Sequence, residues 1–381
     1  MVLTMVASAC GAPMPSDPAP GPEGPAPGWT ELAVAPVGPR HGAQAFWTGT
    51  ELLVVGGDAL APACAFQQHC EPGPRDVRSD GAALDLASGT WRAIANAPIP
   101  LFDMAGSVVE GRLYLLVYGA GPGVAAAPAF LAYDPTADTW SELPAPGAAR
   151  FGFLGAGSRL VAYHPTQELG VEPDRVFDPS TGDWADLPLD PLAPAYDRDA
   201  VWTGADLVVL GIRLDPARPP NKPPVYSAAA ISLPVGDWRR IPDSVITGWN
   251  PSWHWSGGAI ANASTGSGDG GQTNNWGREV PFGGMLVPPA GTWADLPAPP
   301  REGGGLTGLD ASGPMHVVSY DGWVLDVPAG RWERLPEPPN GQLEGVAATW
   351  ARDRLVVWGG VAWEGRNGVL SGAGWAWGPS P

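Results

Sequence analysis

The chain has 381 residues, a formal net charge of −18 and, in Lys222, a single lysine. This acidity disfavours nucleic acid and anionic membranes as partners, because binding a polyanion requires a basic stripe that displaces counterions. The 53 glycines and 46 prolines suggest disorder, but 44% hydrophobic residues and 19 tryptophans supply enough apolar surface for a core, so we interpret Gly and Pro as turn residues.

The first ten residues resemble the end of a bacterial export signal. Val2 to Ala9 is short and apolar, and Ala7-Ser8-Ala9 precedes Cys10, as in a lipobox whose cysteine is lipidated after cleavage. Ala7 stands where lipoboxes favour Leu, so secretion after an A-x-A cleavage site and a disordered tail with an accidental cysteine remain alternatives. We expect a signal remnant over 1–10, a disordered Pro/Gly-rich linker over 11–28 and a protein of the cell envelope, lipid-anchored through Cys10 or secreted.

The two other cysteines, Cys64 and Cys70, are six residues apart in one loop. Outside the cytosol such a pair is expected to form a disulfide. The alternative is a metal site that adds His69, but zinc needs a fourth ligand and the usual C-x-x-C spacing is absent. We therefore expect a disulfide and neither a metal nor another cofactor. No run of about 20 apolar residues occurs, so no transmembrane helix is expected.

From residue 29 onward the chain repeats a motif of the form Gly/Asp-x-Trp-x-x-Leu-Pro. Its seven tryptophans are spaced 39 to 62 residues apart and are Trp29, Trp91, Trp140, Trp184, Trp238, Trp293 and Trp332. About 50 residues for each anchor is the length of a kelch repeat. The anchors therefore predict seven equivalent structural units.

Within a unit, short apolar runs alternate with turns. Residues 44–47, a turn at 48–50 and residues 52–57 predict two strands, and the pattern recurs at 200–210 and 348–360. A third strand ends in an Asp-Pro turn, most clearly at 133–136, and the anchor Trp opens a fourth. Nothing in the sequence predicts a helix.

On these anchors and turns, the chain resembles Kelch-repeat proteins, including the galactose-oxidase-like group, over residues 29–381. The Gly-Gly pair that ends the second strand survives at Gly56-Gly57 and Gly359-Gly360 only. The resemblance implies an all-β, seven-bladed propeller of four-stranded antiparallel blades, whereas a β-sandwich array would leave seven equivalent anchors unexplained. Trp29 has no strands before it, so we expect an N-terminal strand to complete the C-terminal blade of one monomeric domain.

The connections between second and third strands are long, notably 58–79, 164–174, 212–224 and 265–281, and we expect ligands at the face where they emerge. Near the starts of the innermost strands, the residues expected to surround the channel mouth are Arg40, His41, Asp103, Arg150, Asp197, Arg198, Trp249, Trp276, Arg301, Glu302 and Glu344. Arginines and indoles suit a polar organic ligand, a sugar or a peptide. The alternative is that these charges pair with one another.

No catalytic motif is recognisable, so the first hypothesis is a non-catalytic binding or scaffold protein that recognises protein or carbohydrate. The second is an extracellular enzyme of the galactose-oxidase-like or sialic-acid-mutarotase-like type. The copper oxidases of the former group would need two His, two Tyr and a free Cys, drawn here from His41, His164, His254 and His316, seven tyrosines and cysteines that we assign to a disulfide. For a sugar isomerase the candidates are Arg301, Glu302 and Glu344.

Overall fold

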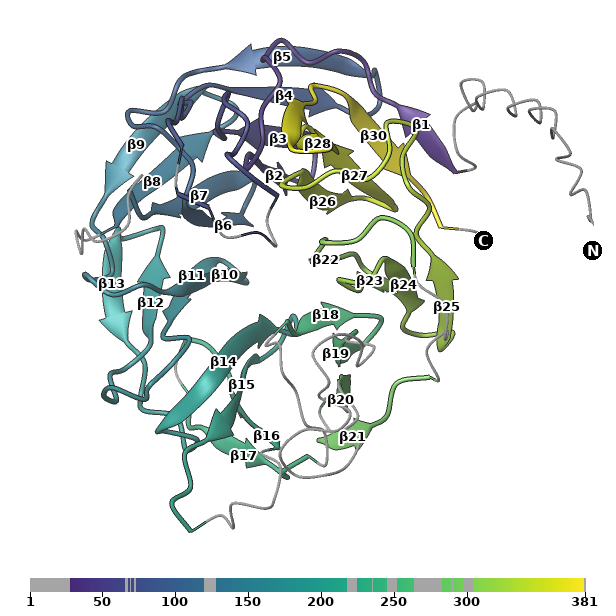
Figure 1. The fold of residues 1–381 in the computed structure, drawn as a ribbon. Coiled ribbons are helices and arrows are strands. Elements are labelled where there is room, and N and C mark those ends of the chain that lie inside the picture. The colour runs from purple at the N-terminus through teal and green to yellow at the C-terminus, as the bar shows by residue number, and fades with distance from the viewer. Residues whose placement is uncertain are drawn as a thin grey trace, which may run out of the picture.

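In the computed structural model, seven four-stranded antiparallel sheets stand as blades around a central axis (Figure 1). This arrangement confirms the seven-bladed propeller expected from the repeat. The structure describes residues 28–65, 68, 70–71, 73–119, 128–217, 225–234, 236–244, 252–263, 283–288, 291–297 and 304–379. The signal remnant predicted over 1–10 and nearly all of the predicted linker lie outside the described residues.

Each blade runs from an innermost to an outermost strand. The first comprises β2 (Gln44–Trp47), β3 (Glu51–Val55), β4 (Gly81–Asp85) and β5 (Thr90–Ile94), and the second β6 (Met104–Val109), β7 (Arg112–Val117), β8 (Ala129–Asp134) and β9 (Thr139–Leu143). The third comprises β10 (Gly152–Ala156), β11 (Arg159–Tyr163), β12 (Arg175–Asp178) and β13 (Asp183–Asp186), and the fourth β14 (Ala195–Trp202), β15 (Leu207–Arg213), β16 (Tyr226–Ile231) and β17 (Arg239–Ile241). The fifth comprises β18 (His254–Ser256), β19 (Ala259–Asn262), β20 (Gly284–Val287) and β21 (Thr292–Ala294), and the sixth β22 (Ala311–Ser312), β23 (His316–Val318), β24 (Trp323–Asp326) and β25 (Arg331–Arg334).

The seventh blade closes the ring with strands from both ends of the chain. It comprises β26 (Ala347–Ala351), β27 (Arg354–Trp358), β30 (Gly374–Trp377) and, outermost, β1 (Trp29–Glu31). Trp29 lies opposite Trp377 in the antiparallel ladder, which confirms the predicted closure. The sequence did not predict the hairpin β28 (Val361–Glu364) and β29 (Asn367–Leu370), which is inserted between β27 and β30 and pairs with neither.

The core lies between neighbouring blades rather than inside any one sheet. Both faces of a middle strand are covered, and Leu52 to Val55 of β3 are accordingly at most 1% exposed. Leu53 of the first blade shares a buried cluster with Leu115 and Leu131 of the second. This explains why second strands are continuous apolar runs, whereas a half-exposed strand would alternate.

The repeated tryptophans join each blade to the next through one recurring hydrogen bond. Every anchor indole N–H donates to the carbonyl four residues after the preceding anchor. The seven bonds, 2.6 to 3.1 Å long, are Trp29 to Pro336, Trp91 to Ala33, Trp140 to Ala95, Trp184 to Pro144, Trp238 to Pro188, Trp293 to Pro242 and Trp332 to Pro297. Each copy of the motif therefore provides both partners of the bond. Its indole N–H donates to the preceding copy, and the backbone carbonyl at its proline position accepts from the following copy.

The turns between third and fourth strands are built locally. The Asp134 carboxylate accepts the N–H groups of Thr136 and Ala137, and Asp178 accepts that of Ser180 in the same way. Such Asx turns need only a short polar side chain at the strand end, which the Asp-Pro signal supplies. Among the described residues there is no helix long and apolar enough to cross a membrane.

Candidate functional site

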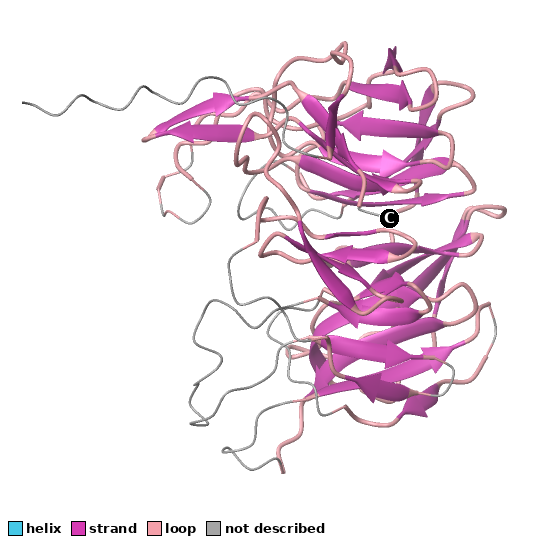
Figure 2. Cartoon of the chain, turned by 90° about the vertical axis from the view of Figure 1, so that its right-hand side faces the viewer, coloured by secondary structure: helices cyan, strands magenta, loops and turns pink. Residues whose placement is uncertain are grey.

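The two ends of the channel differ in the length of their connections. Connections from second to third strands and from blade to blade emerge at one end, which we call the long-loop face. Figure 2 shows a two-stranded hairpin, β28–β29, projecting from one side of the disc. The first-to-second and third-to-fourth turns at the other end span only two to four residues wherever the whole turn is described. A rigid scaffold with long connections at one end is a common setting for a binding site.

Exposed apolar side chains are concentrated on the long-loop face. Ten large hydrophobic residues are exposed among those described, and eight of them belong to connections at this face: Val34, Leu60, Leu169, Val171, Leu189, Leu214, Tyr320 and Val369. Val287 and Met315 belong to the opposite face. These side chains offer apolar contacts to a partner that docks on this face.

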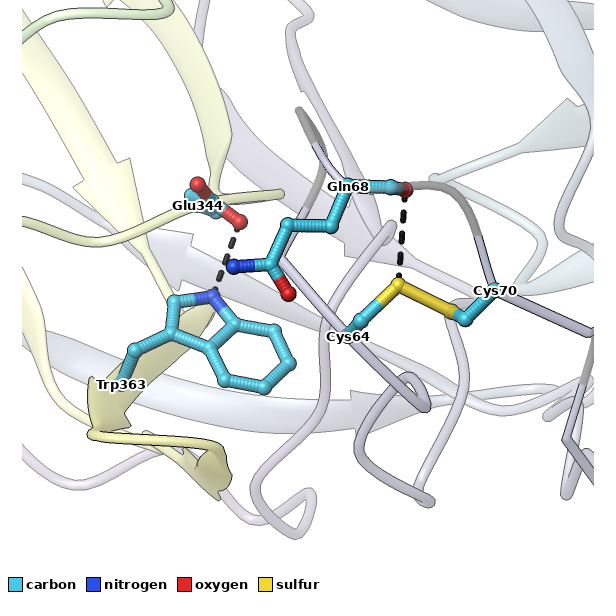
Figure 3. The surroundings of a disulfide bond; sticks show 5 residues. All are labelled: Cys64, Gln68, Cys70, Glu344 and Trp363. Atoms are coloured by element: carbon cyan, nitrogen blue, oxygen red, sulfur yellow. Dashed lines mark hydrogen bonds between the residues drawn. A yellow bond between two sulfur atoms is a disulfide. The ribbon is translucent and has the colours of Figure 1, made fainter.

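The first and seventh blades contribute a cross-linked part of this face (Figure 3). Cys64 and Cys70 form a disulfide with a Cα–Cα distance of 6.4 Å, so neither is free to ligate a metal or to cross-link to tyrosine. This contradicts the alternative metal site, whose remaining member, His69, lies outside the described residues. Beside the disulfide loop, a Cβ added to Gly368 of β29 would lie 3.2 Å from the Cβ of Ala61, so the hairpin and the loop are in contact.

Two of the predicted mouth arginines are buried in ion pairs. The Arg40 guanidinium binds both carboxylate oxygens of Asp80, at 2.6 and 3.2 Å. The Arg198 side chain is fully buried, 2.7 Å from Asp174 and 2.8 Å from Asp190. A buried guanidinium that is ion-paired with carboxylates is poorly placed to meet a ligand, and both arginines instead hold segments of the scaffold together.

Other predicted residues are more accessible. Arg150 of the third blade pairs with both oxygens of Asp103 of the second, at 2.6 and 2.8 Å, and its side chain is 63% exposed. His41 lines a pocket of about 230 Å³ inside the disulfide loop. Asp197 has a φ of 45° at the irregular register of β14, and burial, together with the charge of Glu168, raises its pKa.

Glu344 belongs to the cross-linked part of the face. Its carboxylate accepts a 2.8 Å hydrogen bond from the indole N–H of Trp363 in β28 (Figure 3). Trp249, Trp276, Arg301 and Glu302 lie outside the described residues, as does Cys10. The structure thus brings Asp103 and Arg150 together and places Arg40, Arg198 and Glu344 in separate local networks.

A row of polar groups on neighbouring blades was not predicted from the sequence, apart from its histidine. Asp199 of β14 accepts hydrogen bonds from the Tyr163 hydroxyl, at 2.7 Å, and from the backbone N–H of Trp253, at 2.8 Å. In the next pair of blades, His254 Nε2 lies 2.6 Å from Asp310, which also accepts from Ser252. A bulge between Tyr196 and Asp199 shifts the inner strand, so regular alternation could not have identified Asp199.

Two groups of this row have raised pKa values. Burial raises the pKa of Asp199 to about 6, despite the hydrogen bonds from Trp253 and Tyr163 that oppose the shift. Burial lowers the pKa of His254, but its hydrogen bond to Asp310 and the charges of Asp310 and Asp199 outweigh this and leave it above its ordinary value. A carboxyl group whose pKa is raised to about 6, in the same row as an imidazole, is a candidate for proton exchange with a ligand.

We expect Asp310→Asn to lower the pKa of His254, because the substitution removes the charge that opposes desolvation. The raised pKa means that the ion pair contributes stability below the unfolded pKa of about 6.5 and loses it as the pH rises through the folded value. NMR titration of the imidazole Cε1–H measures the shift. His316, whose pKa burial lowers, is the internal control, and an unchanged His254 titration would rule out Asp310 as its partner.

The histidines considered for a copper oxidase are dispersed. His41 lies in the first blade and His164 packs on Phe151 in the third, while His254 is in the fifth and His316 in the sixth. No group of three or more potential metal ligands occurs in the described part of the chain. The disulfide also removes Cys64 and Cys70 as candidates for the cross-link to tyrosine.

Comparison with known proteins agrees with the architecture. No family model matches the chain. A segment of 142 residues is 28% identical to an F-box/kelch-repeat protein of Arabidopsis thaliana. The match covers 35% of this chain and 35% of that relative, so it spans only about a third of the relative's length. Together, the seven four-stranded blades, the closing N-terminal strand and this similarity support a β-propeller of the Kelch type.

Proposed function

We propose that this propeller is an exported protein of the cell envelope that binds a protein or glycan ligand through its long-loop face without catalysing a reaction. The observation that carries the proposal is the segregation of exposed apolar residues, eight of ten among those described, to the long-loop face. Water-exposed apolar side chains cost free energy unless a partner covers them, and a ligand that covers them gains that free energy.

The surroundings of the apolar residues support recognition by a pre-formed surface. Arg198 is clamped between buried carboxylates, and the disulfide restrains the loop at 64–70. A binding surface whose scaffold is restrained in this way loses little conformational entropy when a ligand binds. A disulfide also favours an extracytoplasmic location, which agrees with the proposed signal before Cys10. Mass spectrometry of the mature N-terminus distinguishes a lipid on Cys10 from simple cleavage.

A second candidate is an extracellular carbohydrate-active enzyme, and the row of Asp199 and His254 favours it. A sugar isomerase of the mutarotase type needs an acid and a base. Asp199, whose pKa burial raises to about 6, and the His254 imidazole are candidates for these roles. Of the isomerase candidates taken from the sequence, Glu344 is bonded to Trp363 and the other two lie outside the described residues. Turnover of reducing sugars by the purified chain, lost in Asp199→Asn, would favour this candidate over the first.

We expect the double substitution Leu169→Ser and Val171→Ser to weaken binding at least about tenfold, because the loss of two apolar contacts removes roughly 1.4 kcal/mol or more of binding free energy. Leu169 is 103% exposed and Val171 40%, so folding should be unaffected. The purified chain is first screened against a glycan array and a phage-displayed peptide library, and affinities for the selected ligands are then measured.

The matched control is Val287→Ser, which removes from the opposite face a side chain that is 40% exposed, the same fraction as for Val171. Ligands that lose affinity for the control and not for the long-loop variant would show that the long-loop face is the wrong one.

A further inference from the structure

A pocket of about 660 Å³ lies on the face opposite the long connections, at the seam between the sixth and seventh blades. The turns β22–β23 and β26–β27 line it, together with the residues that flank β1 and β30. Its volume is within the range of small-molecule sites. Because it lies at the other end of the channel, it is independent of the function proposed above.

One wall of the pocket carries a surplus of positive charge. Arg331, Arg352 and Arg354 line it, against the carboxylates of Asp326 and Asp353. Arg331 is held by Asp326 at 3.2 Å. Neither Arg352 nor Arg354 forms a salt bridge with a described residue, although the Arg352 guanidinium also lies 5.6 Å from the centre of the Trp47 ring in the first blade. In a chain of net charge −18, a pocket lined by three arginines and only two carboxylates forms an unusual local attraction for an anion.

Another wall is flat and weakly polar. The His316 ring stacks on Trp350 with centroids 5.3 Å apart and planes 8° from parallel, and Trp350 is itself only 6% exposed. Burial lowers the pKa of His316, so at neutral pH this wall is an uncharged imidazole with a fixed orientation. Met315, 48% exposed, lies beside it and extends the apolar surface.

We propose that this pocket binds a small organic acid that carries a ring. Its carboxylate is held by Arg352 and Arg354, because the planar guanidinium fork matches a carboxylate. Its ring packs against His316 and Met315, which offer one flat and one adaptable apolar surface. One cavity thus combines a positively charged wall with a flat apolar wall. A surface patch that only attracts counterions would lack the second.

Isothermal titration calorimetry on the full chain tests the proposal with defined probes. Benzoate and glucuronate should bind saturably, more tightly than acetate, and the neutral analogues benzamide and glucose should not bind. Arg352→Ala and Arg354→Ala should each weaken binding of the acids about tenfold, the usual effect of losing a hydrogen bond to a charged group. Arg354→Lys should retain part of the affinity, because the charge persists without the fork.

Arg366→Ala is the matched control, since Arg366 is an exposed arginine in the β28–β29 turn at the long-loop face. An equal loss of affinity in this variant would show that only net charge matters and would overturn the site. The proposal also fails if neither acid binds, or if acetate or inorganic phosphate binds as tightly as the ring-bearing acids. Unfolding midpoints of all variants should match that of the unsubstituted chain, since the three substituted arginines are exposed.

Discussion

Replacement of Arg198 by Ala should destabilise the propeller by about 3–5 kcal/mol, the usual cost of removing one partner of a buried ion pair. The Arg198 side chain is fully buried, and those of Asp174 and Asp190 are only 4% and 3% exposed. The substitution leaves two carboxylates in a space from which water is excluded, with no positive charge to offset their desolvation. Urea unfolding, followed by tryptophan fluorescence, measures the loss.

The position of Arg198 explains why the effect should reach beyond one strand. It belongs to β14 of the fourth blade, whereas Asp174 precedes β12 of the third and Asp190 lies in the connection between the two blades. Its guanidinium also donates to the carbonyl of His164 in the third blade. One side chain therefore joins two blades and their connection at the long-loop face.

Arg150→Ala is the matched control, because Arg150 also joins neighbouring blades through a carboxylate. Its side chain is 63% exposed and that of Asp103 is 39% exposed, so the loss should be about 1 kcal/mol or less. The deficit of Arg198→Ala should also shrink in acid, since protonation removes the buried charges of Asp174 and Asp190. Equal losses in the two variants, at any pH, would mean that Arg198 has no structural role and is available to a ligand.

The contrast between these arginines shows what sequence alone cannot decide. The sequence predicted both arginines at the channel mouth, because each lies near the start of an innermost strand. Both side chains also carry the same charge. Whether the side chain is buried depends on partners such as Asp174, which lies 24 residues away on another blade. Burial of a charge is a property of the assembled ring, so no local pattern reveals it.

The fold could be predicted because its signals are local and repeated. Each anchor tryptophan, each Asp-Pro turn and each apolar run can be recognised within a few residues of sequence. Trp29 also predicted that an N-terminal strand completes the C-terminal blade, because no other strands of its blade precede it in the chain. The hairpin β28–β29 and the bulge before Asp199 each occur once and are not part of the repeat. Comparison of the repeated units therefore could not predict them. The candidate sites consist largely of such unrepeated features.

Removal of β1 should destabilise the ring by at least about 3–5 kcal/mol and cause self-association. Trp29 is only 5% exposed, and loss of a buried tryptophan alone costs this much. The loss extends to the ladder between β1 and β30 and to the indole bond from Trp29 to Pro336. It also exposes the edge of β30, and an unpaired edge is a template for another chain. Unfolding in urea and light scattering measure the two effects.

The comparison is between a chain that begins at Gly28, which keeps β1, and one that begins at Leu32, which lacks it. A synthetic peptide of residues 28–36 added to the shorter chain should pair with β30, restore stability and suppress association, because it supplies both the ladder and the Trp29 indole. The same peptide with Phe in place of Trp29 lacks the N–H donor to Pro336 and should restore less. If the shorter chain were as stable and as monomeric as the longer one, the three C-terminal strands would suffice for the seventh blade. The indole hydrogen bond from Trp29 to Pro336 would then not be needed to close the propeller.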